Sequence, residues 1–167
     1  MKLQFIPVET ESQIHLLASM ADKVWHEFFS GIITVEQVDY MVERFQSETA
    51  LTRQIDVDGY EYFFLELNGI NIGYFGVHVE ADAKKLFLSK LYLLKSYRGK
   101  GYATQAFQFL EGVAMGFHLK SIYLTVNRGN THSVDVYKNW GFVTVKEEAT
   151  DIGNGFVMDD YIMEYTL

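Results

Sequence analysis

Apolar residues recur along this chain with two spacings, one typical of helices and the other typical of strands. Thr10 can cap a helix, with Gln13 in the capping-box position, and the apolar residues that follow keep a helical period until Gly31. The same period predicts helices at about 35–55 and 103–116, followed by a short helix that stops at Gly141. We therefore expect four helices.

Seven segments are instead rich in strand-forming residues and bounded by turn residues. They are 3–8, 60–67, 70–79, 84–94, 121–126, 142–147 and 156–167. Asn68-Gly69 is a strong hairpin signal between the second and third segments. The order of helices and strands predicts one α/β domain over residues 1–167, with a mixed sheet of about seven strands and a central βαβ unit.

Composition narrows the class of function. The chain has 167 residues, a net charge of -8 and no cysteine. The lack of cysteine excludes disulfides, thiolate metal sites and cysteine nucleophiles. The acidic balance disfavours nucleic acid and favours a cationic substrate or partner. No segment resembles a signal peptide or reaches the roughly 18 apolar residues of a membrane helix, so we expect a soluble, cytoplasmic protein without membrane contact.

The stretch "SYRGKGYATQAF" places two cations and two glycines between a predicted strand and a predicted helix. It lacks the lysine followed by serine or threonine that a Walker loop requires. A dinucleotide fingerprint fits poorly, because its third glycine is replaced by Thr104 and no acidic residue follows at the required distance. Arg98, Gly101 and Ala103 match a third pattern, R/Q-x-x-G-x-G/A, although a basic surface turn is the alternative.

That third pattern resembles the acyl-CoA loop of the GCN5-related N-acetyltransferase (GNAT) superfamily. A second stretch, "NRGNTHSVDVYKNWGF", resembles another superfamily signature through Asn130, Tyr137 and Gly141-Phe142. The stretches "VWHEFFSGIITVEQVDYMVERF" and "DIGNGFVMDDYIMEYTL" resemble a bacterial group that includes polyamine acetyltransferases. The resemblance implies acetyl-CoA as cosubstrate and direct attack of a primary amine, possibly of a polyamine, on the thioester through a tetrahedral intermediate.

The resemblance also implies roles for individual residues. Backbone N–H groups at the helix start would receive the pyrophosphate, and glycines would allow its close approach. The residues concerned are Arg98, Gly99, Lys100, Gly101, Tyr102 and Ala103. The backbone of Leu91, Tyr92 and Leu93 would pair with the pantetheine arm. Asn130 would contact that arm or cap its helix, and Tyr137 would be the general acid or a core aromatic.

The general base is less defined, because Ser89 stands close to the position where many relatives carry a glutamate. Water relayed past a neighbouring titratable residue is expected to take its place. The candidates are Glu66, His78, Glu80, Asp159 and Asp160. Trp25, Glu27 and Phe28 are expected to shape the acceptor pocket, or simply to belong to the core and surface.

No metal site is expected, because adjacent strand carboxylates such as Asp159 and Asp160 point to opposite faces and the five histidines show no ligand spacing. The expected partner is a small-molecule amine, and a homodimer is possible. Two other functions remain open from the sequence. One is acetylation of a protein N-terminus or lysine, and the other is an acyl-CoA-binding module without turnover.

Overall fold

The structure is a computed structural model that describes residues 3–167. Within this range the chain forms five α-helices, one 3-10 helix and seven strands. The elements are β1 (Leu3–Pro7), α1 (Glu11–Phe28), α2 (Val35–Gln46), α3 (Glu48–Asp56), β2 (Tyr60–Leu67), β3 (Ile70–Glu80), β4 (Lys85–Leu93), η1 (Lys95–Tyr97), α4 (Tyr102–Gly116), β5 (Ser121–Asn127), α5 (Thr131–Trp140), β6 (Val143–Gly153) and β7 (Phe156–Thr166).

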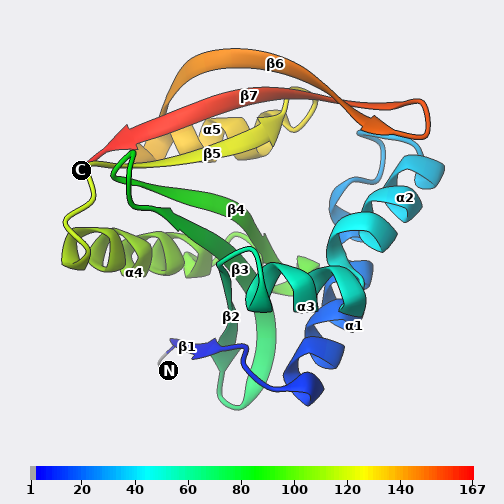
Figure 1. Cartoon of the computed structure of the whole chain (residues 1–167), viewed down its shortest axis with the longest axis horizontal. Coiled ribbons are helices and arrows are strands. Elements are labelled where there is room, and N and C mark those ends of the chain that lie inside the picture. The colour runs from blue at the N-terminus through cyan, green and yellow to red at the C-terminus, as the bar shows by residue number, and fades with distance from the viewer. Residues whose placement is uncertain (1–2) are drawn as a thin grey trace. The chain divides into compact units, whose positions relative to one another are not determined.

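The strands form one mixed sheet in the order β1-β2-β3-β4-β5-β7-β6 (Figure 1). β4 and β5 pair in parallel, whereas β1–β2, β2–β3, β5–β7 and β6–β7 are antiparallel. A parallel pair requires a long crossover, and α4 supplies it. The predicted α/β class and the seven-stranded mixed sheet are therefore confirmed.

The chain divides into two compact units. One contains the residues up to His78 together with Lys90–Leu110, and the other contains Val79–Ser89 together with Glu111–Leu167. We call them the N-terminal and C-terminal units and describe each by itself. The single-domain organisation stays a prediction.

Strand alternation explains the layers of the N-terminal unit. The rings of Phe63 and Phe75 stack at 5.0 Å, and both contact Phe109 of α4. Tyr62 and Tyr74 point to the other face, where they bond to Gln46 at the end of α2. Helices α1–α3 and the first turns of α4 thus cover opposite faces of β2 and β3.

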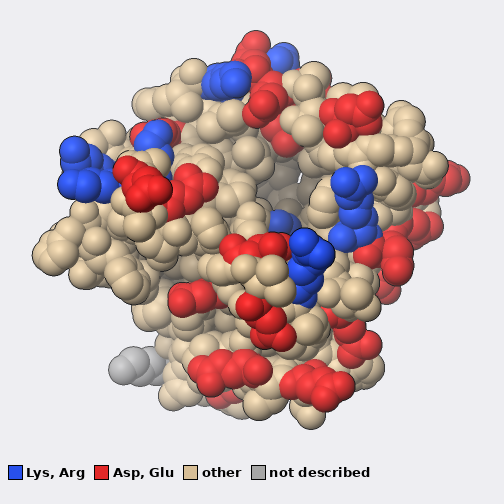
Figure 2. All heavy atoms as spheres, viewed as in Figure 1, with Lys and Arg blue, Asp and Glu red and all other residues tan. Residues whose placement is uncertain are grey.

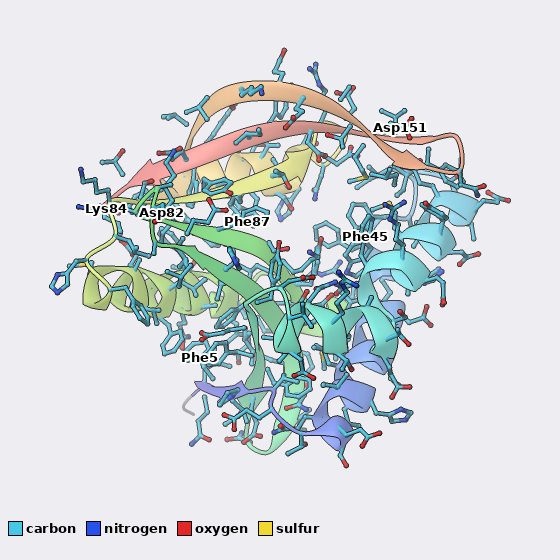
Figure 3. The ribbon with its side chains drawn as sticks, viewed as in Figure 1. Phe5, Phe45, Asp82, Lys84, Phe87 and Asp151 are labelled. Carbon is cyan, nitrogen blue, oxygen red and sulfur yellow. The ribbon has the colours of Figure 1, made fainter. Side chains whose placement is uncertain are left out.

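The same alternation orders the C-terminal unit. Tyr165 of β7 donates a hydrogen bond of 2.8 Å to Glu111 of α4, and Met163 on the same face is fully buried. Glu164, which lies between them, points to the opposite face of the sheet. The β6–β7 hairpin continues to the pair Gly153–Phe156, beyond the last β5–β7 pair, and Asp151 lies near its tip (Figures 1 and 3).

Two predicted elements were wrong in extent. The predicted helix 35–55 is two helices, so the count is five and not four. Ser47 causes the break, because its backbone is extended (ψ 162°) and its hydroxyl accepts from the Ala50 N–H, which starts α3. Strand β6 continues past the predicted 142–147 to Gly153, and Asn154-Gly155, both with positive φ, then forms the turn.

The predicted helix start and hairpin turn are confirmed. Thr10 and Gln13 form the capping box, and Asn68 and Gly69 have φ of 52° and 81°. None of the helices between residues 3 and 167 is long and apolar enough to cross a membrane.

Candidate active site

The glycine loop of the N-terminal unit lies between η1 and α4. Gly99 and Gly101 have φ of 74° and 85°, a left-handed backbone that favours glycine. A Cβ added at either position would meet no atom within 4 Å, so the surface beside the loop is open. The Gly101 carbonyl accepts the first α4 bond from Gln105 at 3.1 Å. The loop therefore leads exposed backbone into a helix N-terminus, an arrangement that suits the pyrophosphate of a bound nucleotide.

Arg98 turns back toward the protein. Its Nε donates to the Leu93 carbonyl at 3.0 Å, and its guanidinium lies 5.2 Å from the centre of the Phe28 ring. Burial lowers the pKa of Arg98, and the Glu27 carboxylate opposes that shift. Arg98 Nη2 and Glu27 Oε2 are both buried without a hydrogen bond. Arg98 thus braces the loop against the last turn of α1, and a phosphate contact from it stays a prediction.

Lys100 lies beside the same loop and is exposed. Its Nζ sits 5.8 Å from the centre of the Tyr97 ring. Tyr102 and Ala103 are half-buried in the first turn of α4. The pyrophosphate contacts of these three residues stay predictions.

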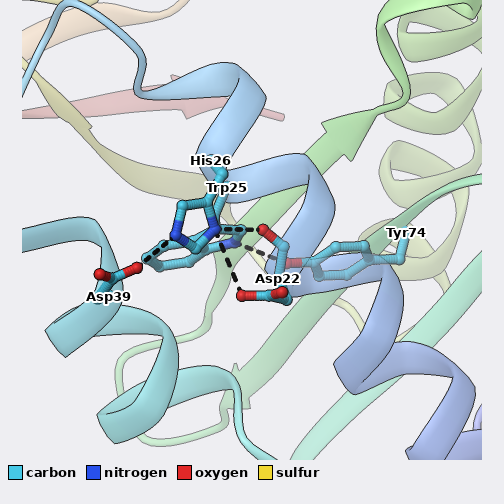
Figure 4. Close-up of polar contacts among 5 residues, drawn as sticks. All are labelled: Asp22, Trp25, His26, Asp39 and Tyr74. Atoms are coloured by element: carbon cyan, nitrogen blue, oxygen red, sulfur yellow. Dashed lines mark hydrogen bonds and ion pairs between the residues drawn. The ribbon is translucent and has the colours of Figure 1, made fainter. Parts of the chain in front are cut away.

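An aromatic cluster joins α1 to the end of β4. The Tyr92 ring packs edge-on against Trp25 and Phe28, at 5.6 and 5.0 Å between centroids. Trp25 is only 3% exposed, and its indole N–H donates to the Tyr74 hydroxyl at 2.8 Å (Figure 4). Trp25 is therefore a core residue, whereas Phe28 and Glu27 are half-buried at the edge of this cluster.

β3 and β4 approach closely beside that cluster. A Cβ at Gly73 would overlap the Tyr92 carbonyl, and the Leu94 N–H donates to Ile72 O at 2.9 Å. Glu66 lies on β2 opposite Gln4 of the edge strand, one strand further from β4. Within the N-terminal unit, Glu66 is thus separated by β3 from the predicted pantetheine-pairing segment.

In the C-terminal unit, Tyr137 lies on α5 and Asn130 directly precedes this helix. Tyr137 packs against Trp140 and Phe142, and burial raises the pKa of its phenol to about 12. Its hydroxyl therefore carries a proton at neutral pH, as a general acid requires. Asn130 is the N-cap residue, since its Oδ1 accepts from the Ser133 N–H at 3.3 Å, which confirms the capping role.

One face of the C-terminal sheet carries polar groups. Phe87 of β4 and Tyr123 of β5 stack at 4.8 Å, and the Tyr123 hydroxyl donates to Glu80 at 2.6 Å (Phe87 is labelled in Figure 3). Asp160 lies opposite Asn127 of β5, four residues along from Tyr123. Residues directly opposite one another share a face, so Asp160 and Tyr123 lie on the same side of the sheet.

Asp160 is the most perturbed carboxylate of this face. It is half-buried, and its Oδ1 is buried without a hydrogen bond. Burial and, to a smaller extent, the carboxylates of Asp159 and Glu148 together raise the pKa of Asp160 to about 6. Asp159 itself is exposed and pairs with Arg128 at 2.8 Å. The two adjacent aspartates therefore have different environments.

Several polar features were not anticipated from the sequence. Burial lowers the pKa of Lys90 in β4 to about 8, although the side chain as a whole is half-exposed. Phe87 in "KLFLSK" and Tyr123 in "SIYLTVN" were also missed. Strand alternation could have identified them, because each points to the face opposite the buried leucines beside it. His26 and Asp39 were also missed, because their pairing depends on how α1 and α2 pack.

Carboxylates are widespread on the surface. Figure 2 shows Asp and Glu over more of the visible face than Lys and Arg, in keeping with the net charge of -8. In the part of the chain that the structure describes, no group of three or more His, Cys, Asp or Glu side chains is arranged to hold a metal ion.

A mixed sheet with a glycine loop opening the crossover helix is the architecture of the acyl-CoA-dependent transferases that the sequence resembles. The sequence profile described as "Acetyltransferase (GNAT) family" matches residues 19–142, and the chain belongs to this family. It is therefore an acetyltransferase with acetyl-CoA as cosubstrate.

Relatives and solved structures agree with this assignment. An uncharacterised N-acetyltransferase of Lactobacillus delbrueckii subsp. lactis is 25% identical over 151 residues, 87% of each chain. PaiA N-acetyltransferase from Thermoplasma acidophilum, solved with coenzyme A, superposes with a TM-score of 0.79 at 21% identity and 100% coverage of both chains. Spermidine/spermine N-acetyltransferase SpeG from Vibrio cholerae gives 0.71 at 17% identity, covering 98% of this chain and 93% of that one. These structures share the fold.

Proposed function

We propose that this chain transfers the acetyl group of acetyl-CoA to a primary amine of a small cationic molecule, with polyamines as the leading class. The observation that carries the proposal is Asp160, a half-buried carboxylate with an unpaired buried oxygen on the same sheet face as Tyr123. Support also comes from the net charge and from the spermidine/spermine acetyltransferase among the solved structures of this fold.

The donor would be held by the glycine loop. Open space beside Gly99 and Gly101, together with the α4 N-terminus, fits a pyrophosphate, and the loop holds no carboxylate that would repel it. Acetyl-CoA supplies an activated thioester. The backbone near Leu91–Leu93 would orient it, and Tyr137 would hold a proton for the leaving sulfur.

Proton removal from the amine is the demanding step. An alkylammonium has a pKa of about 10.4, and an ordinary aspartate has a pKa of about 3.9. Transfer of a proton from the first to the second costs roughly 9 kcal/mol. With the Asp160 pKa at about 6, that cost falls to roughly 6 kcal/mol. The gain of about 3 kcal/mol is an upper limit, because solvent screens a partly exposed carboxylate. Asp160 is still mostly ionised at pH 7.5, so it is ready to accept a proton.

The spacing of carboxylates on this face also supports a linear, multiply charged acceptor. Tyr123, whose hydroxyl donates to Glu80, and Asn127, the partner of Asp160, are four residues apart on β5. At the rise of a strand this is about 13 Å. Glu80 would bind a distal ammonium, and the proton of the reacting amine would pass to Asp160 through water.

The test compares Asp160→Asn with Asp159→Asn, which removes the adjacent exposed carboxylate. Free thiol release is followed with polyamines, monoamines and peptides across pH 5–9. We expect kcat/KM of the wild type to fall below pH 6, where Asp160 becomes protonated, and to fall on the order of 10²-fold in Asp160→Asn at pH 7.5. Asp159→Asn should keep most activity.

Three outcomes would contradict the proposal. Wild-type rates in Asp160→Asn would remove its role as proton acceptor. Peptides acetylated better than every amine would assign the chain to protein acetylation. Coenzyme A binding without thiol release for any acceptor would make it a silent binding module.

A further inference from the structure

His26 lies in the last turn of α1 with both ring nitrogens facing acceptors (Figure 4). Its Nδ1 is 2.7 Å from the carbonyl oxygen of Asp22, and its Nε2 is 2.5 Å from Oδ1 of Asp39 on α2. A carbonyl and an ionised carboxylate only accept hydrogen bonds, so both nitrogens must donate. Only the imidazolium form of histidine carries two N–H groups, and this geometry therefore requires a protonated His26.

The charges around the ring favour that form. The backbone carbonyl of Asp22 and the Asp39 carboxylate raise the pKa of His26 above its ordinary 6.5, and the Asp22 carboxylate, 3.3 Å from Nδ1, adds to the shift. Asp22 lies on the same helix, and Asp39 lies on the helix packed against it. Partial burial opposes the shift without cancelling it.

The turn that carries His26 also carries contacts to the donor loop. Trp25 packs on Tyr92 of β4, and Phe28 packs on Tyr92 and lies beneath the Arg98 guanidinium. Arg98 in turn bonds to the Leu93 carbonyl and leads directly into Gly99. A chain of contacts within the N-terminal unit thus connects α2 to the glycine loop through the end of α1.

We propose that His26 is a positioning residue, a proton-dependent clamp that ties Asp39 of α2 to the last turn of α1 and thereby sets the position of Phe28 under Arg98. When His26 loses its proton, one ring nitrogen presents a lone pair to an acceptor, and that link breaks. Val38, Met41 and Val42 keep the apolar face of α2 buried, so the fold survives while the clamp opens. The clamp is closed below the ordinary histidine pKa and opens as the pH rises through the raised pKa.

The first test measures the clamp and is independent of any activity. The His26 ring is titrated by NMR in the wild type, in Asp39→Asn and in Glu43→Gln, which removes an exposed carboxylate one turn further along α2. We expect a wild-type pKa above 6.5, a clear drop in Asp39→Asn and no drop in Glu43→Gln. A wild-type value at or below 6.5, or equal values in the wild type and Asp39→Asn, would overturn the clamp.

The second test measures positioning and rests on the proposed donor loop. The Kd for coenzyme A is measured from pH 6 to 8.5 in the wild type and in His26→Gln, so that ionisation of coenzyme A itself cancels in the ratio. We expect the ratio of the two Kd values to change by about 1.4-fold to 5-fold between pH 6 and pH 8.5. This is the size of effect that an exposed charge pair typically has. A constant ratio would refute the positioning role. Failure of both proteins to bind coenzyme A would refute the donor loop and the positioning role together, while the titration still decides the clamp.

Discussion

The Tyr74 hydroxyl is the centre of a buried hydrogen-bond chain that runs through the N-terminal unit. It accepts from the Trp25 indole at 2.8 Å and donates to Gln46 Oε1 at 2.7 Å. Gln46 donates to the Tyr62 hydroxyl, and Tyr62 donates to Gln54 of α3. Because Tyr74 and Gln46 are both 0% exposed, water has no access to replace a missing partner. The chain joins α1, α2 and α3 to strands β2 and β3.

Replacing Tyr74 with phenylalanine removes one oxygen. Two buried groups, the Trp25 N–H and Gln46 Oε1, then have no hydrogen-bond partner. Each unsatisfied buried polar group costs about 1–3 kcal/mol, and the loss is partly offset because the phenylalanine buries no hydroxyl. We therefore expect the free energy of unfolding to fall by roughly 2–4 kcal/mol. That is a large part of the 5–15 kcal/mol that stabilises a typical domain.

The assay is equilibrium unfolding in urea, with the m-value checked for two-state behaviour. Tyr40→Phe is the matched control, since its hydroxyl accepts from Arg44 at a more exposed site and its loss should cost well under about 1 kcal/mol. The double variant Tyr74→Phe/Gln46→Met should cost less than the sum of the two single variants, because the second change removes an orphaned acceptor. A loss below about 1 kcal/mol for Tyr74→Phe, or strict additivity, would refute this account.

Two further variants test the donor site. Gly101→Val should weaken coenzyme A binding at least about tenfold by calorimetry, because its side chain would fill the open space beside the loop, whereas Gly112→Ala in the helix that follows the loop should not. Unchanged binding in a folded Gly101→Val protein would remove the phosphate-loop assignment. Tyr137→Phe should lower kcat on the order of 10²-fold with little change in KM for acetyl-CoA. The control Tyr165→Phe should leave kcat near the wild-type value. Normal turnover in Tyr137→Phe would make Tyr137 a core aromatic only.

Local rules were enough to predict most of the elements. The Thr10–Gln13 capping box and the Asn68-Gly69 turn each depend on a few neighbouring residues, and both were found where the sequence placed them. The break between α2 and α3 was missed because "RFQSETALT" keeps helical composition on both sides of Ser47. A serine that caps the next helix and an ordinary helical serine look the same in a single sequence.

The site was less accessible to sequence reasoning, because its chemistry depends on burial and on partners from other elements. Nothing local in "MDDYI" distinguishes the exposed, ion-paired Asp159 from Asp160, whose pKa is raised by burial. Arg98 matched the loop pattern, yet its contact with Phe28, seventy residues earlier, turns its guanidinium inward. Motifs therefore predict the donor loop, whereas register and packing determine which carboxylates have a raised pKa.

The position of Ser89 bears on the path by which the proton of the amine reaches Asp160. Alternation from Phe87 puts Ser89 on the same sheet face as Asp160, two strands away, because β5 lies between β4 and β7. Two strand spacings of about 4.8 Å make the separation at least about 10 Å, and the β4–β5 pairing ends one residue before Ser89, at Leu88–Leu124. A proton leaving an amine near β4 would cross that distance through a few waters to reach Asp160.

A carboxylate placed at position 89 would shorten the path to a single contact. Ser89→Glu introduced into the Asp160→Asn variant should therefore restore much of the lost kcat and keep an acidic limb in its pH profile, whereas Ser89→Gln should restore nothing. Equal rates for the two double variants would show that the proton leaves by a path that does not use this face.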